Sequence, residues 1–476
     1  MKSSSGRGAA PEGPPASAPR RIVSHPVFGE GEVLDSRWGG TELFCRFASG
    51  LRLWLPTGRL RLVRAVTAEL VAGVSPRVSA VTRIQARRML EAFRLGIVPV
   101  QDIETFTFGR EREVRVAEAT LAGLAQGTGD VCLVEGEYGT GKTHLLEYIH
   151  HRALKEGFCT TICRLDPLEV TPHRPKRVYR EVINNLRYLR DGREHGYRDL
   201  LREAIELDLG DHVFFGPVLA KLRRLDAGRL ESEVFWQWIE GESTKEYATD
   251  TASRNRVRGG QRIPALYDFS TAADFYCNIL SAVSWIARRC GLMGLVLLLD
   301  EAETVTRLWD VVYLAKSVNF MEGLVRTARN DPELRRINSR MIHNRVRPVP
   351  YIYRDPSLLL VFATTPMPYE YGYLKLANRI DRRVVLAPLE DRALVEAFST
   401  LVTVYQRAYE GFTISELDQK RVFRGAVERG ADGVRTFIKY CVESLDTARY
   451  RPEHEAHEDG APAPVSPGSA SDSRSR

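Results

Sequence analysis

The sequence has few cysteines and no long apolar run, and both absences narrow the class of protein. Seven cysteines are scattered over 476 residues, and the closest pair, Cys159 and Cys163, has no matching Cys or His pair elsewhere. This spacing argues against a metal site, and we interpret the thiols as small core residues in a reducing cytoplasm. No apolar stretch reaches the length that spans a bilayer, and the Ser-, Gly- and Pro-rich beginning lacks the apolar segment of a signal peptide. We therefore expect a cytoplasmic protein without a membrane partner.

The charge balance lacks a strong excess of either sign. The formal net charge is +7, and the remaining composition is that of an ordinary globular protein. Such a charge is compatible with an anionic partner but does not require one. Residues 1–19 and 450–476 are low-complexity tails, too poor in apolar residues to order themselves. The chain between them is long enough for more than one domain.

A glycine-rich segment carries the strongest chemical signal. It reads Gly136, Glu137, Tyr138, Gly139, Thr140, Gly141, Lys142 and Thr143. The apolar run 131–134 precedes it and the helix-like stretch 145–154 follows it, which is the strand-loop-helix context of a P-loop. Backbone N–H groups wrap a phosphate only where side chains do not intrude, and the helix directs its positive end at the anion. We expect Lys142 to reach the β- and γ-phosphates of ATP and Thr143 to bind Mg²⁺.

A second apolar run, 295–299, ends in two carboxylates and predicts a strand buried on both faces. Asp300 at its end is expected to hold the Mg²⁺ shell. Glu301 is expected to polarise the water that attacks the γ-phosphate, and its alternative role is a cap on the following helix. A third run, 358–363, ends in Thr364 and Thr365, where a hydroxyl can sense the γ-phosphate. The alternative there is the ordinary β-propensity of threonine.

Three blocks follow one another along the chain. Residues 20–65 predict a small all-β barrel, residues 80–390 an α/β nucleotide-binding domain with a parallel sheet, and residues 391–449 a helical domain. The charged stretch 195–260 is expected to be a mostly helical insertion. For the barrel we predict a core of Val23, Phe28, Val33, Phe44, Phe47 and Trp54. Its sequence from Val23 to Gly50 resembles the Tudor/SH3-like module at the C-terminal end of UvrD-type helicases, which implies a docking module.

The order of motifs resembles the AAA+ (ASCE) P-loop ATPases, in the branch that includes replication initiators. That resemblance implies a helical lid, and it gives Gly109 and Arg110 as nucleotide-binding residues and Thr365 as sensor 1. It also implies an arginine finger among Arg379, Arg382 and Arg383, and Arg435 as sensor 2. The alternative for any such arginine is a solvated side chain near a helix end.

A closer resemblance covers residues 80–445. The P-loop with His144 after it, and the segment Leu165–Glu169 leading into Pro172–Arg180, resemble the BREX-system ATP-binding proteins (BrxD-type) of anti-phage defence. Relatives of that family act beside a helicase and a TerB-like protein in the Shango system. The resemblance implies ATP and Mg²⁺ as cofactors, a homo-oligomer, and partners among BREX or Shango components. The N-terminal barrel departs from the family pattern, so the defence system stays open.

Two function classes remain. The first is an ATPase that engages double-stranded DNA and partner proteins in defence, with Arg335, Arg336, Arg340, Arg345 and Arg347 as candidate phosphate contacts. The alternative for this cluster is a solvated basic loop. The second class is a nucleotide-dependent switch or scaffold that recruits a helicase without touching nucleic acid. A stand-alone helicase is excluded because the sequence shows no second motor domain.

Overall fold

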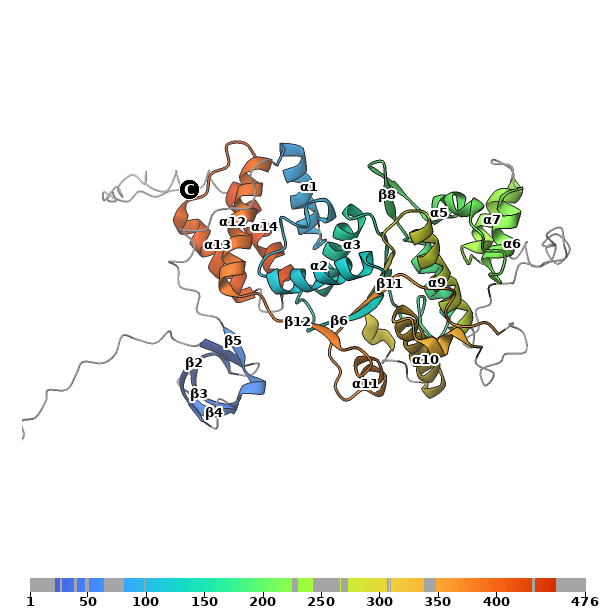
Figure 1. The fold of residues 1–476 in the computed structure, drawn as a ribbon. Helices are drawn as coiled ribbons and strands as arrows, with labels where there is room; N and C mark the ends of the chain where they lie inside the picture. Colours follow the sequence, from blue (N-terminus) through green and yellow to red (C-terminus); the bar gives the residue numbers. More distant parts are fainter. Residues whose placement is uncertain are drawn as a thin grey trace, which may run out of the picture. The chain divides into compact units, whose positions relative to one another are not determined.

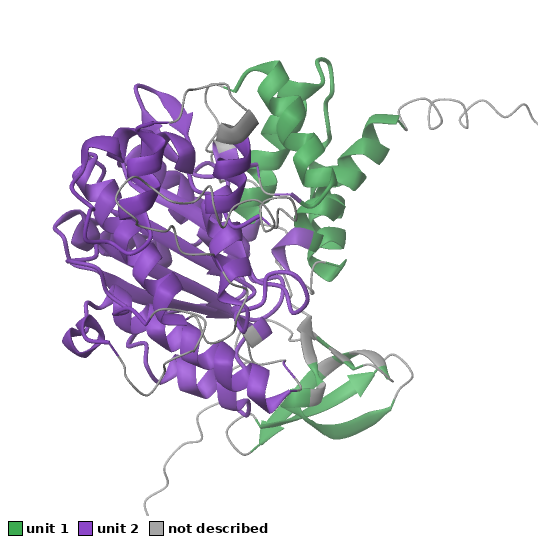
Figure 2. Cartoon of the chain, turned by 90° about the vertical axis from the view of Figure 1, so that its right-hand side faces the viewer, with its two compact units in different colours: residues 1–96, 395–431, 436–476 green, residues 97–394, 432–435 purple. Residues whose placement is uncertain are grey.

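The structure is a computed structural model of the whole chain. The residues it describes are 22–25, 28–37, 41–47, 51–63, 81–97, 99–224, 230–242, 266, 273–305, 308, 310–337, 348–429 and 433–450. The chain divides into two compact units (Figure 2). One contains residues 1–96, 395–431 and 436–476, and the other contains residues 97–394 and 432–435.

The N-terminal block of the first unit is a curved antiparallel sheet with strand order β4-β3-β2-β1-β5 (Figure 1). Its strands are β1 (Ile22–His25), β2 (Gly29–Arg37), β3 (Glu42–Phe47), β4 (Arg52–Pro56) and β5 (Arg61–Val63), with the 3-10 turn η2 (Thr57–Arg59) before β5. The pairing of β2 with β3 shifts between Val33 and Asp35, and such a bulge increases the bend of a strand. The predicted small all-β module is present as this sheet.

The core of this sheet differs in part from the predicted one. The buried residues are Val23, Leu43, Cys45, Phe47 and Leu55. Side chains alternate along a strand, so Leu43, Cys45 and Phe47 share the inner face and Phe44 lies on the outer face opposite Trp54. Phe44 and Trp54 are half-buried, and Phe28 is 37% exposed. The prediction was therefore wrong for these three aromatic residues, because it followed size rather than strand alternation.

The second unit is built on a parallel five-stranded sheet of order β12-β6-β11-β10-β7. Its strands are β6 (Asp130–Gly136), β7 (Cys159–Arg164), β10 (Leu295–Asp300), β11 (Leu358–Thr364) and β12 (Arg382–Leu386). β11 lies between the P-loop strand β6 and the Asp300 strand β10, and it pairs in parallel with both. Because the carboxyl ends of parallel strands meet at one edge, the residues that follow β6, β10 and β11 converge there.

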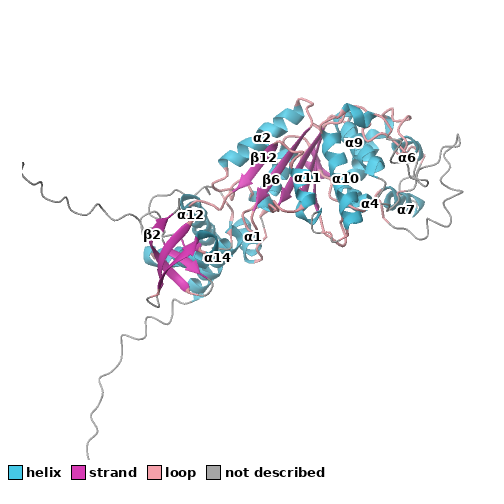
Figure 3. Cartoon of the chain, turned by 90° about the horizontal axis from the view of Figure 1, so that it is seen from below, coloured by secondary structure: helices cyan, strands magenta, loops and turns pink. Residues whose placement is uncertain are grey.

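Helices cover both faces of this sheet (Figure 3). They are α2 (Glu111–Ala125), α3 (Lys142–Lys155), α4 (Pro175–Asn184), α9 (Ala273–Arg289), α10 (Val311–Ala328) and α11 (Tyr371–Ala377). Val296 and Leu298 of β10 are buried with residues of α2 and α3, whereas Leu297 and Leu299 are buried with residues of α4, α9 and α10. All six residues of β10 are buried, as the continuous apolar run predicts.

Short elements complete this unit. They are η4 (Val100–Asp102), β8 (Tyr188–Arg190), β9 (Arg193–His195), α5 (Tyr197–Glu203), η5 (Ala204–Glu206), α6 (Phe215–Leu222), α7 (Leu230–Ile239), η6 (Ala302–Val305) and η7 (Pro332–Arg335). In the insertion expected at 195–260, the described residues contain the helices α5, α6 and α7 and the turn η5, and residues 225–229 and 243–260 lie outside the described part.

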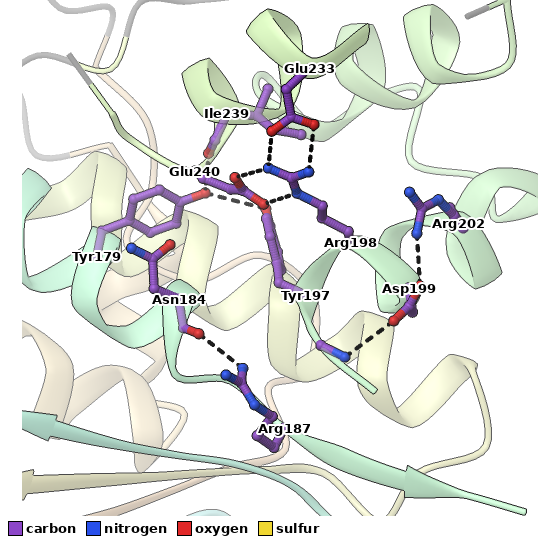
Figure 4. A network of polar contacts seen from close by, with 11 residues as sticks. Tyr179, Asn184, Arg187, Tyr197, Arg198, Asp199, Arg202, Glu233, Ile239 and Glu240 are labelled. Carbon is purple, nitrogen blue, oxygen red and sulfur yellow. Dashed lines mark hydrogen bonds and ion pairs between the residues drawn. The ribbon is translucent and has the colours of Figure 1, made fainter. Parts of the chain in front are cut away.

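An arginine holds α7 onto the rest of the insertion. Arg198 of α5 makes paired hydrogen bonds of 2.6–2.9 Å to the carboxylates of Glu233 and Glu240 (Figure 4). Beside it, the Tyr179 hydroxyl donates to the backbone oxygen of Ile239 at 2.7 Å. The positive charge of Arg198 is balanced by two carboxylates of the same chain, so we assign this cluster a structural role.

The first unit contains the helices α1 (Arg83–Arg94) and α13 (Glu416–Arg429), and all but the first few residues of α12 (Asp391–Ala408) and α14 (Val434–Tyr450). Thr82 caps α1 with a reciprocal capping box to Gln85. Arg94 of α1 forms a two-pronged ion pair with Asp446 of α14 at 2.7 and 2.8 Å. The sequence grouped α1 with the nucleotide-binding domain, whereas its side chains here contact α14 and the end of α12.

Candidate nucleotide-binding site

The turn between β6 and α3 has the backbone of a phosphate-binding loop. Gly139 and Gly141 have φ angles of 82° and 97°, a region that favours glycine. A Cβ atom on Gly136 would lie 2.4 Å from Thr140 Oγ1 and 3.0 Å from Leu386 Cβ, so the loop closes on itself only with glycine there. Glu137 and Tyr138 are exposed at the crest of the turn. The glycines of the loop therefore leave its backbone groups uncovered by side chains at the start of α3.

The Lys142 ammonium is buried inside the loop. Its Nζ donates to the backbone oxygens of Gly136 at 2.8 Å and Glu137 at 3.3 Å, and to Thr365 Oγ1 at 3.2 Å. An ammonium has three N–H donors, and each has an acceptor here. The contact with Thr365 joins two residues separated by 223 positions in the sequence, as the prediction of a shared site requires.

Thr143 and Asp300 are in direct contact. The Thr143 hydroxyl donates to Asp300 Oδ2 at 2.9 Å, and Asp300 is only 2% exposed. Thr143 lies in the first turn of α3 and Asp300 is the last residue of β10. A hydroxyl and a carboxylate oxygen side by side are ligands of the kind that Mg²⁺ accepts.

Glu301 follows Asp300 with an unusual backbone. Its φ angle is 56°, a left-handed conformation that is uncommon outside glycine, and its N–H donates to Asp300 Oδ1 at 3.0 Å. Such strain costs about 1–3 kcal/mol and concentrates at functional sites. The conformation turns the chain sharply after β10, and the Glu301 residue is exposed.

A second glutamate, which the sequence analysis did not select, lies deeper in the site. Glu303 of η6 is only 4% exposed. Its Oε1 accepts from the Thr365 hydroxyl at 2.8 Å, and its Oε2 accepts from the Thr365 N–H at 3.2 Å. The signal in the sequence was a third acidic residue two positions after Glu301, but only the turn at Glu301 shows which acid faces Thr365.

Arg110 supports the loop from outside the P-loop motif. Its guanidinium donates to the backbone oxygen of Thr140 at 2.7 Å and pairs with Glu113 at 3.4 Å. The side chain is buried, which lowers its pKa. Gly109, just before it, has a φ of 61°. Of the two predicted residues, Arg110 therefore contacts the loop directly, at Thr140, and Gly109 only precedes it in the chain.

The side chain of His144, in the first turn of α3, is held by a hydrogen bond to Thr107. Its Nε2 lies 2.9 Å from Thr107 Oγ1, whose hydroxyl also lies 2.7 Å from the Ile103 backbone oxygen. Burial, together with the nearby Arg110 charge, lowers the pKa of His144 to about 4. The imidazole is therefore neutral near pH 7 and serves the packing of the loop. Thr107 is a second site residue that the sequence analysis did not select.

The first residues of the segment expected to carry sensor 2 contact the phosphate-binding loop at Gly139. The Val434 N–H lies 3.3 Å from the Gly139 backbone oxygen. A Cβ on Gly433, whose φ is 129°, would lie 2.7 Å from the same oxygen, so this approach depends on glycine. Arg435 is the next residue and is exposed.

The three candidate finger arginines have different environments. Arg379 follows α11 and pairs with Glu322 of α10. Arg382 is the first residue of β12 and its Nε donates to Asp130 at 2.7 Å. Arg383 donates to the backbone oxygens of Ala377 and Ile380, at the end of α11. Arg383 therefore has a local structural role, while Arg379 and Arg382 are more than two-fifths exposed.

A tyrosine connects the P-loop strand to α11, the helix before Arg379. The Tyr373 hydroxyl donates to Glu135 Oε1, and Glu135 is the buried residue before Gly136. Burial and this carboxylate raise the pKa of Tyr373 to about 12, so the hydroxyl keeps its proton. The phosphate loop and the candidate finger segment are thereby linked through one hydrogen bond.

The candidate nucleic-acid residues are only partly within the described chain. Arg335 and Arg336 are exposed, and Arg335 pairs with Asp355 at 2.5 Å. Arg340, Arg345 and Arg347 lie outside the described residues.

The donor set of the loop fits a nucleoside triphosphate with Mg²⁺. The loop joins glycine backbone, a helix N-terminus and a buried ammonium, which together suit a polyphosphate. Thr143 and Asp300 supply the oxygen pair for the cation. Elsewhere within the described ranges, no cluster of three or more His, Cys, Asp or Glu is arranged to hold a metal ion. Among the helices described, none is long and apolar enough to cross a bilayer.

Two known proteins or families resemble parts of this chain. Among solved structures, the chain is similar to the Aeropyrum pernix ORC1 protein in complex with DNA, at 15% identity and a TM-score of 0.29, over 75% of this chain and 69% of that one. No curated protein sequence matches the chain significantly. A family model described as "BREX system ATP-binding protein BrxC/D" matches residues 81–206, which include the P-loop and α4. The predicted α/β fold with a parallel sheet is confirmed by the structure, and residues 81–206 match the family of BREX system ATP-binding proteins BrxC/D.

Proposed function

We propose that this protein binds ATP with Mg²⁺ at the β6–α3 loop and hydrolyses it. The observation that carries the proposal is the convergence of Lys142, Thr143, Asp300 and Thr365 within direct hydrogen-bond contact. These residues come from three separate parts of the sequence and meet at the carboxyl edge of one sheet. A glycine-rich turn formed by chance would not bring a buried ammonium and a buried carboxylate to the same place.

Each residue has a defined part in this proposal. Lys142 neutralises phosphate charge, and the N-terminus of α3 adds its backbone N–H groups. Thr143 and Asp300 would hold Mg²⁺, which would neutralise phosphate charge. Glu301 orients and polarises the attacking water. Arg110 and His144 keep the loop in shape, and Arg435 reaches the nucleotide from the segment that meets Gly139.

We further propose that turnover requires a second copy of the chain. Arg379 is the best-placed finger of the three candidates, because it lies on the loop after α11 and is 52% exposed. In the single chain its guanidinium pairs with Glu322. In the assembly, the guanidinium would leave Glu322 and contact the nucleotide of the neighbouring copy. Arg382 is the second candidate, and Arg383 is the weakest because it caps α11.

The biological setting that we propose is anti-phage defence. The support is the family match, because its description names the BREX system. The partners in this proposal are other defence components, such as a helicase, a TerB-like protein or BREX proteins, together with double-stranded DNA. The second candidate function, a nucleotide-dependent switch that recruits a partner without DNA, is favoured by the internal pairing of Arg335 with Asp355.

Two measurements test this proposal. Phosphate release from ATP by the purified full chain, with and without Mg²⁺, tests the enzyme activity, and no release above background would overturn it. Binding of the full chain to duplex DNA at several salt concentrations separates the two function classes. Affinity that falls steeply with salt, and that is lost when Arg335, Arg336, Arg340, Arg345 and Arg347 are neutralised, supports the DNA-engaging ATPase. Salt-independent or absent DNA binding supports the switch.

A further inference from the structure

Glu303 holds the residue that is expected to sense the γ-phosphate. Both of its carboxylate oxygens are used on Thr365: Oε1 accepts from the hydroxyl at 2.8 Å and Oε2 accepts from the N–H at 3.2 Å. Glu303 is only 4% exposed, so this pair is well shielded from water. Hydrogen bonds to a carboxylate are about twice as strong as neutral ones.

The Thr365 hydroxyl already has two partners. It accepts from Lys142 Nζ at 3.2 Å and lies 2.8 Å from Glu303 Oε1. A hydroxyl has a single proton to donate. Because the carboxylate cannot donate when ionised, the Thr365 proton in this arrangement points to Glu303. It is not available to a phosphate oxygen unless the bond to Glu303 breaks.

Lys142 is restrained in the same chain of contacts. Its three N–H donors have acceptors on Gly136, Glu137 and Thr365. A phosphate therefore has to displace at least one of these acceptors before it receives a donor from Lys142. The arrangement Lys142–Thr365–Glu303 is thus satisfied within the protein.

We propose that Glu303 is a positioning residue that competes with the γ-phosphate for the Thr365 hydroxyl, and so sets how strongly the site prefers ATP over ADP. This inference rests on the proposed nucleotide site and goes beyond it. A diphosphate has no γ-phosphate and leaves the Thr365–Glu303 pair intact. A triphosphate gains the Thr365 donor only at the cost of a charge-assisted hydrogen bond.

The test is the ratio of two dissociation constants, for ADP and for a non-hydrolysable β,γ-imido analogue of ATP, both with Mg²⁺. Glu303→Gln replaces the charged acceptor by a neutral one of the same shape. We expect the variant to shift the ratio toward the triphosphate analogue by about 5- to 10-fold, the difference between a charged and a neutral hydrogen bond. Glu303→Ala, which removes the acceptor, is expected to shift the ratio in the same direction.

Thr365→Val provides the matched control, because it removes the hydroxyl at nearly constant size. If Glu303 acts through Thr365, the Glu303→Gln change has less than about a twofold effect on the ratio in the Thr365→Val background. An equal effect in both backgrounds would overturn the inference, as would an unchanged ratio in Glu303→Gln with a melting temperature close to that of the parent.

Failure of the inference is distinguishable from failure of the proposed function. If the parent chain binds neither ADP nor the analogue, the nucleotide site itself is wrong. If it binds both but the ratio is insensitive to Glu303, only the role of Glu303 is wrong. Should Glu303→Gln and Glu303→Ala both fail to fold, Thr365→Val alone decides. The inference then requires that Thr365→Val changes the ratio by less than about twofold, because the parent hydroxyl is held by Glu303, and a larger loss of triphosphate preference overturns it.

Discussion

The hydroxyl of Thr143 donates a 2.9 Å hydrogen bond to Oδ2 of Asp300, across 157 positions of sequence. This contact places the first turn of α3 against the end of β10. It brings together the two residues that the sequence selected independently as ligands of one cation. A strand between β6 and β10 does not prevent the contact, because α3 crosses over the sheet to reach it.

Removal of the loop ammonium tests the phosphate site. Lys142→Ala is expected to weaken binding of an ATP analogue by at least about 10- to 100-fold, because charge-assisted contacts to phosphate are lost. Equilibrium titration with a fluorescent nucleotide measures this. Lys155→Ala is the matched control, since Lys155 is on the same helix but is half-exposed and pairs with Glu104 at 3.0 Å. Equal affinities for the two variants would exclude Lys142 from the site.

The finger assignment predicts a dependence on protein concentration. If Arg379 acts in a neighbouring copy, turnover per chain rises with concentration, and Arg379→Ala removes the rise while nucleotide affinity stays within about twofold. Measured arginine fingers contribute about 10³–10⁵ in rate. Arg329→Ala, which breaks a surface pair with Asp381 at 3.0 Å, serves as the control. A specific activity that is flat through the range where light scattering shows assembly would contradict this account.

The buried imidazole of His144 predicts a pH effect on stability. Its pKa is about 4 in the folded protein, against an ordinary value of 6.5. Between these values the unfolded chain binds more protons, so stability is fully present above about pH 6.5 and falls as the pH drops toward 4. His144→Gln should flatten the fall of melting temperature over this range relative to the parent. His150 and His212 also have a pKa of about 4, so part of the fall should persist in the variant. Parallel curves for parent and variant would show that the pKa of His144 is not lowered in the folded protein.

The barrel is expected to be a separable docking module. Its core consists of its own residues, Val23, Leu43, Cys45, Phe47 and Leu55. Deleting residues 1–66 should leave nucleotide affinity and basal hydrolysis within about twofold of the parent, and it should abolish defence in cells through loss of recruitment. A truncated protein that cannot bind ATP would make the block part of the ATPase. Full protection by the truncated protein would remove the docking role.

Much of this site was predictable because its chemistry is local. The P-loop needs glycine at Gly139 and Gly141 and a lysine at a fixed offset, and the buried run before Asp300 is continuous in sequence. The contribution of Glu303 was not predictable, because it depends on the left-handed turn at Glu301 and on which acid faces β11. The roles of Thr107 and Tyr373 depend on packing between distant segments, which no local pattern shows.

The barrel core illustrates the opposite error. Large aromatic residues were assigned to the interior, but the register that pairs Phe44 with Trp54 puts both on the outer face. A shift of one residue in strand register moves every side chain to the opposite face of the sheet. The size of a side chain therefore does not predict which face it lies on.

ATP hydrolysis at this site is tested most directly by comparing Glu301→Gln with the parent chain. Nucleotide binding and phosphate release are followed in the same samples with Mg²⁺. Glu301 is exposed and follows Asp300, the proposed Mg²⁺ ligand, so we expect nucleotide affinity within about threefold of the parent. We also expect phosphate release to be slower by at least about 100-fold, because general-base catalysis contributes about 10²–10⁴ in rate. Phosphate release at the parent rate would contradict the assignment of the water-activating residue, and a parent chain that binds no nucleotide would contradict the account as a whole.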